Sequence, residues 1–297
     1  MALVSVVICA WRPRADWLRT AVRSALGQRD ADVEVIVVDD GSPEPVEPLL
    51  EGLGDPRLRC VRKDHGGLAA ARNHGIGLAR GQWVRFLDAD DEFPADSTAR
   101  LVELARRHPG AIVYGWTTFC DAELRPVWAM RSRVRGDARV ACVTGRFSVR
   151  VPAMMFPRVL LERVRFDPSF PTTEDWDFLL RALDHAQVAG GDFEALRYRR
   201  AGGGLTADRE AGERDARRAI AAWFERHPEA RGTRTERLAR GYLHAQAARA
   251  AVAHGEPRAA VPEALRAARL APGALLQELR LGGLALAGKL RAARRAE

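Results

Sequence analysis

The chain has 297 residues, of which 47% are hydrophobic and 29% charged, with four cysteines. This length can bury a large core, and the composition excludes a collagen, a disulfide scaffold and a wholly disordered chain. The net charge of +8 is unevenly distributed: residues 1–205 hold 29 Lys and Arg against 28 Asp and Glu, whereas residues 206–297 hold 18 against 11. The basic character therefore belongs to the last third of the sequence.

Strands and helices are expected to alternate along the first part of the chain. Apolar runs predict buried strands at residues 4–10, 34–38, 58–62 and 83–87, and one-sided apolar patterns predict helices at 15–26, 47–53 and 68–79. This alternation indicates a parallel sheet with helices on both faces. Right-handed crossovers place the carboxyl ends of its strands, and the loops that follow them, at one edge.

The pattern changes after residue 110. Strands are expected at residues 111–119, 126–134 and 193–199, with a weaker one at 140–151, and a helix at 174–188. Beyond Gly202-Gly203-Gly204 the sequence is rich in Ala, Arg and Leu with helical periodicity. We therefore expect an α/β domain over residues 1–205 and a basic α-helical region over 206–297.

The cysteines and the N-terminus bear on localisation. Cys9, Cys60, Cys120 and Cys142 form no C-x-x-C pair, which favours reduced thiols in a cytoplasmic protein. The apolar first ten residues lack a basic stretch and resemble a strand more than a signal peptide. Because no run of about 18 uncharged apolar residues occurs, no transmembrane helix is expected.

Acidic residues end two of the predicted strands. Asp88-Ala89-Asp90-Asp91 follows the strand at 83–87, and in extended backbone Asp88 and Asp90 would share one side, where carboxylates suit Mg²⁺ or Mn²⁺. The alternative is an acidic turn, with Asp91 or Asp96 starting a helix. Asp39 and Asp40 end the strand at 34–38 and would point to opposite faces. One could bind a nucleobase or ribose, or both could simply form an Asp-Gly-Ser turn.

Two predicted helix starts also carry candidate groups. Gly66-Gly67 opens the helix that contains Arg72, and such an N-terminus offers N–H groups to an anion, although an ordinary strand-to-helix turn is equally compatible. Thr173-Glu174-Asp175 precedes Trp176. These residues could place a carboxylate base at the mouth of a cleft, or merely cap a stable helix with a Thr and acidic residues.

Each signal is weak alone, but in this order they resemble the family 2 glycosyltransferases, which have the GT-A fold. The resemblance covers roughly residues 3–205. The matching segments are Val4-Ser-Val-Val-Ile-Cys-Ala-Trp-Arg12, Val37-Val-Asp-Asp-Gly-Ser42, Gly66-Gly-Leu-Ala-Ala-Ala-Arg-Asn-His-Gly-Ile76, Phe86-Leu-Asp-Ala-Asp-Asp91 and Thr173-Glu-Asp-Trp176.

The resemblance implies a role for each matching position. It places the base and ribose of a nucleotide donor against Cys9, Ala10, Trp11, Asp39 and Asp40. It brings Gly67 and Arg72 to the nucleotide, Asp88 to the ribose and metal, and Asp90 to Mn²⁺ or Mg²⁺. It makes Asp175 the catalytic base, beside Glu174. Four positions depart from the family: Trp11-Arg12 replaces Tyr-Asn, His65 replaces Asn, and Ala201 stands where a His is common.

The activity implied is inverting transfer of a sugar from a nucleotide donor, a UDP-sugar, to a hydroxyl of a glycan, lipid carrier, natural product or peptide. Residues 111–160 and 200–206 would meet this acceptor, with Trp116, Trp128, Trp176 and Met154-Met155 as candidate contacts or core residues. The alternatives are a nucleotidyltransferase, whose glycine-rich basic loop after the first strand is missing, and a degenerate transferase that binds partners through its tail.

The basic tail has three candidate partners: an anionic membrane surface at the inner face of the membrane, another subunit, or nucleic acid. Residues 271–295 are Leu-rich with interspersed charges, which fits an interfacial amphipathic helix or a packed helix with a solvated basic face. Aromatic residues are nearly absent from the tail, so we expect no nucleic-acid partner.

Overall fold

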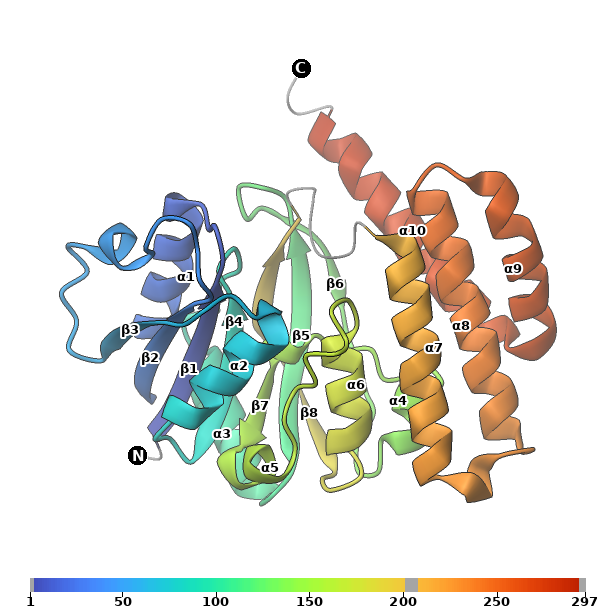
Figure 1. The fold of residues 1–297 in the computed structure, drawn as a ribbon, viewed down its shortest axis with the longest axis horizontal. Coiled ribbons are helices and arrows are strands. Elements are labelled where there is room, and N and C mark those ends of the chain that lie inside the picture. The colour runs from blue at the N-terminus through green and yellow to red at the C-terminus, as the bar shows by residue number, and fades with distance from the viewer. Residues whose placement is uncertain (1–2, 201–207, 294–297) are drawn as a thin grey trace.

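A computed structural model of the protein describes residues 3–200 and 208–293 (Figure 1). In these residues eight strands form one mixed sheet, in the order β3-β2-β1-β4-β7-β5-β6, with β8 paired to β5. The strands are β1 Leu3–Ala10, β2 Asp32–Asp39, β3 Leu58–Arg62, β4 Trp83–Asp88, β5 Ile112–Cys120, β6 Pro126–Met130, β7 Met154–Pro157 and β8 Val188–Arg199. The four N-terminal strands are mutually parallel, as expected.

The second half of the sheet is built around β5. Strand β7 is antiparallel to both β4 and β5, and so joins the two halves. Strand β6 is antiparallel to β5, whereas β8 runs parallel along its whole length. Three of the four predicted strands in this half are present, although β8 begins five residues earlier and β6 ends four residues earlier than the pattern indicates.

One predicted strand is wrong. Residues 140–151 contain helix α4 Arg139–Val143 and the 3₁₀ turn Val151–Ala153, and the strand in this region is β7 instead. Gly145 has a φ of +74°, and the hydroxyl of Thr144 donates to the carbonyl of Val140, so the chain turns where an extended run was expected. Short apolar runs do not distinguish a buried strand from a buried helix.

Helices cover both faces of the sheet (Figure 1). Helices α1 Ala15–Leu26 and α3 Ser97–Arg107 share one hydrophobic core, and α2 Gly67–Leu78 and α6 Glu174–Ala182 share the other. The remaining short helices before residue 200 are the 3₁₀ turn Glu47–Leu50 and α5 Arg158–Arg163. In α1 the buried residues are Leu18, Ala21, Val22 and Ala25, which is the stripe that the sequence predicts. Met154 and Met155 of β7 are fully buried and fill the core.

The basic C-terminal region is helical, as predicted. It contains α7 Arg209–Arg226, the 3₁₀ turn Pro228–Ala230, α8 Arg234–Ala253, α9 Pro257–Leu270 and α10 Pro272–Ala293. Ala219, Trp223 and Phe224 of α7 belong to the same core as Phe178 of α6, so α7 packs directly on the sheet domain. Among the described residues no helix is long and apolar enough to cross a membrane. The division of the chain at residue 205 stays a prediction.

Candidate active site

Strand register brings the predicted site residues to the carboxyl edge of the parallel strands. Cys9 pairs with Asp88 of β4, and the next residue, Ala10, pairs with Asp39 of β2. The acidic ends of β2 and β4 therefore flank the end of β1. Burial raises the pKa of the Cys9 thiol to about 12, partly offset by the positive charge of Arg72, so this thiol is neutral.

Asp39 holds the turn that follows β2. Its buried carboxylate accepts hydrogen bonds from the backbone N–H groups of Ser42 (2.9 Å) and Val46 (3.2 Å) and from Nη1 of Arg62 (3.0 Å). These contacts match the simpler Asp-Gly-Ser turn interpretation. A direct contact of Asp39 with a donor stays a prediction.

Asp40 joins the end of β2 to the start of α2. Its buried carboxylate accepts from Nζ of Lys63 (2.7 Å) and from the N–H groups of Gly66 (3.1 Å) and Gly67 (2.8 Å), and Nδ1 of His65 lies 3.0 Å from Oδ2. The glycine-opened helix therefore receives an anion, as the sequence suggested, but this anion is the carboxylate of Asp40.

Trp11 and His65, two positions that depart from the family pattern, contact each other beside Asp40. The rings of Trp11 and His65 stack with centroids 5.0 Å apart and an interplanar angle of 28°. Trp11 is 50% exposed, and the guanidinium of Arg12 lies 5.3 Å from the centroid of its ring. The N–H of Arg12 donates to the hydroxyl of Ser42 (3.0 Å), which fixes the loop after β1. An exposed aromatic surface thus lies beside Asp40.

Arg72 connects two motifs that are far apart in the sequence. Its buried guanidinium donates from Nη1 to Oε1 of Glu174 (3.0 Å) and from Nη2 to Oδ1 of Asp88 (3.2 Å). The ring of Phe166 lies 5.1 Å below the guanidinium. A planar guanidinium can bind two carboxylates at once, so Arg72 sets the spacing between the acidic end of β4 and the start of α6.

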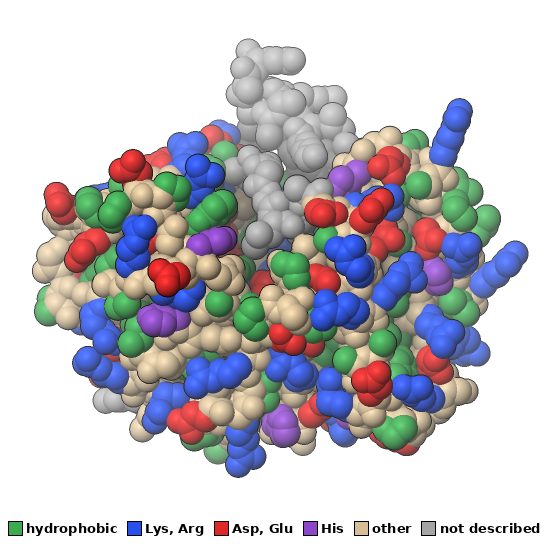
Figure 2. Space-filling model, viewed as in Figure 1, with side chains coloured by type: hydrophobic (Ala, Val, Ile, Leu, Met, Phe, Trp, Pro, Cys, Tyr) green, Lys and Arg blue, Asp and Glu red, His purple; other side chains and the backbone are tan. Residues whose placement is uncertain are grey.

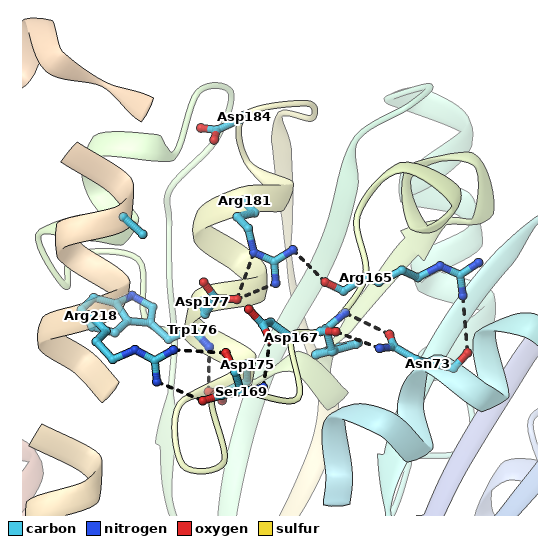
Figure 3. A network of polar contacts seen from close by, with 12 residues as sticks. Asn73, Arg165, Asp167, Ser169, Asp175, Trp176, Asp177, Arg181, Asp184 and Arg218 are labelled. Atoms are coloured by element: carbon cyan, nitrogen blue, oxygen red, sulfur yellow. Dashed lines mark hydrogen bonds and ion pairs between the residues drawn. The ribbon is translucent and has the colours of Figure 1, made fainter. Parts of the chain in front are cut away.

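Glu174 and Asp175 begin helix α6 but lie in different environments. Burial raises the pKa of Glu174 to about 7, and the charge of Asp175 adds to the effect while Arg72 opposes it. Asp175 is half-buried, and its Oδ1 accepts from the N–H of Trp176 (2.7 Å; Figure 3). Its other oxygen makes no hydrogen bond within the described part of the chain and can meet a substrate.

The loop before α6 is fixed by neighbouring elements (Figure 3). The side-chain amide of Asn73 in α2 binds both backbone groups of Phe166, at 2.8 and 2.9 Å. Arg181 of α6 donates to the carbonyl of Arg165 (2.7 Å), and Arg218 of α7 donates to the carbonyl of Ser169 (3.0 Å). Helix α7 of the basic region therefore helps to position the predicted base.

Asp88, Asp90 and Asp91 lie in a turn, in which the N–H of Asp91 donates to the carbonyl of Asp88 (3.1 Å). Asp88 and Asp90 are half-buried, whereas Asp91 is fully buried. Oδ1 of Asp91 accepts from the N–H of Arg199 (2.9 Å), which pins the turn to β8. Of the two residues that the sequence offered as the start of the next helix, Asp91 and Asp96, it is Asp96 that precedes α3.

The chemistry of this turn suits a divalent cation. Burial and the charge of Asp88 raise the pKa of Asp90, so a cation between the two carboxylates would relieve their repulsion. Within residues 3–200 and 208–293 no group of three His, Cys, Asp or Glu side chains forms a metal cluster. Further ligands would have to come from a donor or from water. Ala201 and the rest of segment 201–207 lie outside the described residues.

Sequence reasoning missed several charged residues at this edge. Arg150 lies 4.4 Å over the ring of Tyr198, and its charge interacts with those of Asp175 and Asp91. Arg199 donates from Nε to the carbonyl of Asp90 (2.7 Å), and Lys63 binds Asp40. No periodic pattern marks these residues. In the sequence they are marked only by their basic type.

The predicted acceptor residues contact other side chains. Trp128 stacks on Phe119 with centroids 3.9 Å apart, and Trp116 lies 3.9 Å from the guanidinium of Arg131. Trp176 donates from its indole to the carbonyl of Cys142 (3.3 Å) and packs edge-on against Tyr242 of α8. All three tryptophans retain partial exposure. Their contact with an acceptor stays a prediction.

A cavity lined partly by Trp116 lies away from the acidic strand ends. It has a volume of about 720 Å³ and lies between α1, α3 and β8, where Arg23, Arg100 and Trp116 line it. No predicted donor or catalytic residue lines this cavity. We therefore assign the candidate site from the carboxylates and cations at the strand ends and not from cavity size.

Comparison with known proteins identifies the family to which this mixed sheet with acidic strand ends belongs. The sequence profile of Glycosyl transferase family 2 matches residues 5–164, more than half of the chain, so the protein belongs to this family. The fold is similar to the solved structure of S. aureus TarS residues 1–349 in complex with UDP-GlcNAc, with a TM-score of 0.60 and 14% sequence identity. The structural match covers 91% of each chain. The predicted GT-A fold is thereby confirmed.

Curated relatives cover shorter stretches. The succinoglycan biosynthesis protein ExoO of Rhizobium meliloti is 42% identical over 103 residues, which are 34% of this chain and 29% of ExoO. The uncharacterized glycosyltransferase EpsJ of Bacillus subtilis is 34% identical over 197 residues, 62% of this chain and 57% of EpsJ. The UDP-Glc:alpha-D-GlcNAc-diphosphoundecaprenol beta-1,3-glucosyltransferase WfaP of Escherichia coli is 35% identical over 92 residues, 31% of this chain and 36% of WfaP. The chain spans less than two thirds of each.

Proposed function

We propose that this protein is an inverting glycosyltransferase that moves a sugar from a UDP-sugar to an acceptor hydroxyl, with Asp175 as the general base. The observation that carries the proposal is the bridge of Arg72 between Glu174 and Asp88. This bridge connects the start of α6, where an oxygen of Asp175 has no hydrogen-bond partner among the described residues, to the acidic turn that suits a divalent cation. The membership of the chain in the family 2 glycosyltransferases supports the same activity.

The donor would bind across the ends of β1, β2 and β4. The exposed ring of Trp11, held against His65, offers a stacking surface for a nucleobase beside Asp40. Asp88 would lie near the ribose and diphosphate, and Asp90 together with Asp88 would hold Mn²⁺ or Mg²⁺. When bound, this cation would neutralise the charge of the departing diphosphate. The similarity of the fold to TarS with UDP-GlcNAc supports a UDP-sugar donor.

The reaction requires one base and no covalent enzyme intermediate. The acceptor oxygen attacks the anomeric carbon from the face opposite the leaving group, while Asp175 takes the hydroxyl proton. The new carbon–oxygen bond forms as the bond to the diphosphate breaks, and UDP leaves with the electron pair. A single displacement inverts the configuration. Arg150, whose charge interacts with those of Asp88 and Asp175, supplies further positive charge at this edge.

We propose a glycan or lipid-linked sugar as the acceptor. The names of ExoO and WfaP refer to succinoglycan biosynthesis and to a diphosphoundecaprenol-linked sugar, and both relatives support this class. We infer that the protein acts in the cytoplasm. Its cysteines Cys9, Cys60, Cys120 and Cys142 are free thiols, which supports a reducing compartment.

The test is transfer or donor hydrolysis with a panel of UDP-, GDP- and dTDP-sugars in the presence of Mn²⁺. We expect turnover with a UDP-sugar and a product of inverted anomeric configuration, read by NMR. Asp90→Ala and Asp175→Asn should each lower kcat at least 100-fold, because one removes a cation ligand and the other the base. Asp192→Ala, at an exposed carboxylate away from the site, is the control. Unchanged turnover in both site variants would refute the assignment.

A further inference from the structure

The C-terminal helices expose an unusual number of large aliphatic side chains. Of the eight exposed large hydrophobic residues in the described chain, five lie between residues 252 and 279. Val261 and Leu265 of α9 are each 58% exposed, and Leu276 and Leu279 of α10 are 67% and 60% exposed. Residues three or four apart in a helix lie on one face, so each pair forms an apolar stripe on its helix.

Basic side chains share these faces. On α9, Arg258 and Arg269 have the helical spacing that places them beside Val261 and Leu265, and all four are exposed. On α10, Arg280 is exposed next to Leu276 and Leu279. We name the exposed residues Arg258, Val261, Leu265, Arg269, Leu276, Leu279 and Arg280 the α9–α10 surface. Figure 2 shows basic and hydrophobic side chains interspersed over the helical part of the molecule.

The acids of these two helices point away from the surface. Glu263 of α9 binds His244 and Arg266, at 2.5 Å each. Glu278 of α10 is buried and binds Arg249 of α8. Arg258, Arg269 and Arg280 form no ion pair with the described residues. The α9–α10 surface thus combines aliphatic side chains with uncompensated positive charge.

We propose that the α9–α10 surface binds the surface of an anionic phospholipid bilayer. Aliphatic side chains can enter the boundary between headgroups and acyl chains, while the neighbouring guanidinium groups contact lipid phosphates. A second copy of the chain would bring the same positive surface against itself. Nucleic acid would pair with the arginines but leave four aliphatic side chains in water. An anionic bilayer satisfies both components of the surface.

The second half of α10 continues the basic character of this region. The sequence of α10 from Gly282 to Ala293 contains Lys289 and Arg291 but no acidic residue. The proposal rests on the surface alone and holds whichever sugar the site transfers.

The test is co-sedimentation of the full chain with two kinds of vesicle. One is pure phosphatidylcholine, and the other contains about 30% phosphatidylglycerol as the anionic lipid. We expect binding to the mixed vesicles, little binding to pure phosphatidylcholine, and a loss at high salt. The double variant Leu276→Glu/Leu279→Glu should partition at least tenfold more weakly. Val159→Glu, which changes an equally exposed side chain on α5, is the matched control and should bind like the original protein.

Three results would overturn the proposal. These are no binding to anionic vesicles, equal binding by the double variant, or an equal loss in the Val159→Glu control. Circular dichroism of each variant verifies that the helices are intact. Light scattering without lipid tests the remaining alternative, in which the surface binds a second copy of the chain. If the original protein is dimeric and the double variant is monomeric, the α9–α10 surface is a contact between copies instead.

Discussion

At the scale of single residues, the candidate site depends on how charges are paired. Arg72 is buried between Glu174 and Asp88, and Asp40 is surrounded by Lys63 and two backbone N–H groups. Removing one partner of a buried pair leaves the other charge uncompensated, which costs more than the pair contributes. The protonation state of Glu174 therefore affects both the site and the stability of the fold.

The first prediction concerns the pH dependence of stability. The pKa of Glu174 is raised from 4.5 to about 7 in the folded protein, so its stabilising contribution is complete below pH 4.5 and is lost as the pH rises through about 7. The free energy of unfolding should therefore decrease over this pH range. In Glu174→Gln the side chain cannot ionise, so this decrease should disappear. Urea denaturation from pH 4.5 to 8 measures it. Parallel pH curves for both proteins would contradict the prediction, and Glu162→Gln at an exposed site is the control.

At the scale of elements, two close contacts set how helices dock. Gly75 of α2 faces β1, where an added Cβ would lie 2.2 Å from Cγ1 of Val7. Gly145, in the loop after α4, has a φ of +74° and lies under Tyr242 of α8, whose ring would be 2.2 Å from a Cβ. The first contact holds α2 and Arg72 against the sheet, and the second holds α8 against the sheet domain.

A matched pair of glycines in α2 provides the second prediction. Gly75→Ala should destabilise the protein by about 1–3 kcal/mol, because β1 cannot move away from the added methyl group. Gly77→Ala, two residues later, meets nothing within 4 Å and should stabilise the helix by ~1 kcal/mol. Thermal denaturation of both variants measures the difference. Equal effects would show that α2 does not pack as described.

The third prediction uses two glycines in the left-handed region. Gly145→Ala and Gly232→Ala both place alanine at positive φ, but only the first meets a neighbour, since nothing lies within 4 Å of position 232. The Gly232 variant should lose about 1 kcal/mol from backbone strain alone. The Gly145 variant should lose ~2 kcal/mol more, from overlap with Tyr242. Chemical denaturation separates the two terms, and similar losses would argue against the contact.

At the scale of the whole molecule, the basic helical region and the sheet domain share structure. Trp223 and Phe224 of α7 lie in the core that contains Phe178, and Arg218 and Asp215 of α7 hold the loop before Asp175 through Ser169 and Thr172. Charge and core packing therefore divide the chain differently. Most of the net positive charge follows residue 205, but the core extends into α7.

The fourth prediction follows from this shared core. Trp223→Ala should cost ~3–5 kcal/mol and lower the unfolding temperature of the sheet domain as well as of the helices. Trp223→Phe should cost less, because it keeps a ring and removes an indole N–H that has no partner in the described structure. Far-ultraviolet and near-ultraviolet circular dichroism should report one coincident transition. Separate transitions would show that α7 unfolds independently.

Much of the fold was predictable because its signals are local. The buried runs of β1 to β4 and the stripe of α1 are read from neighbouring residues, and the predicted bounds of α1 and β3 agree with the structure. The failures have physical reasons too. Val140–Val143 and Met154–Pro157 are both short and apolar, so periodicity could not identify which is the helix and which the strand.

The sequence by itself determined which chemical groups stand at the strand ends, because strand order and right-handed crossovers place those ends at one edge. Only the tertiary structure decided which of these groups contact each other. Arg72 and Glu174 are 102 residues apart, and Trp11 and His65 come from different loops. Contacts between residues so far apart in the sequence depend on how whole elements pack, and no local pattern encodes them. Packing likewise joined α7 to the core and left the α9–α10 surface exposed.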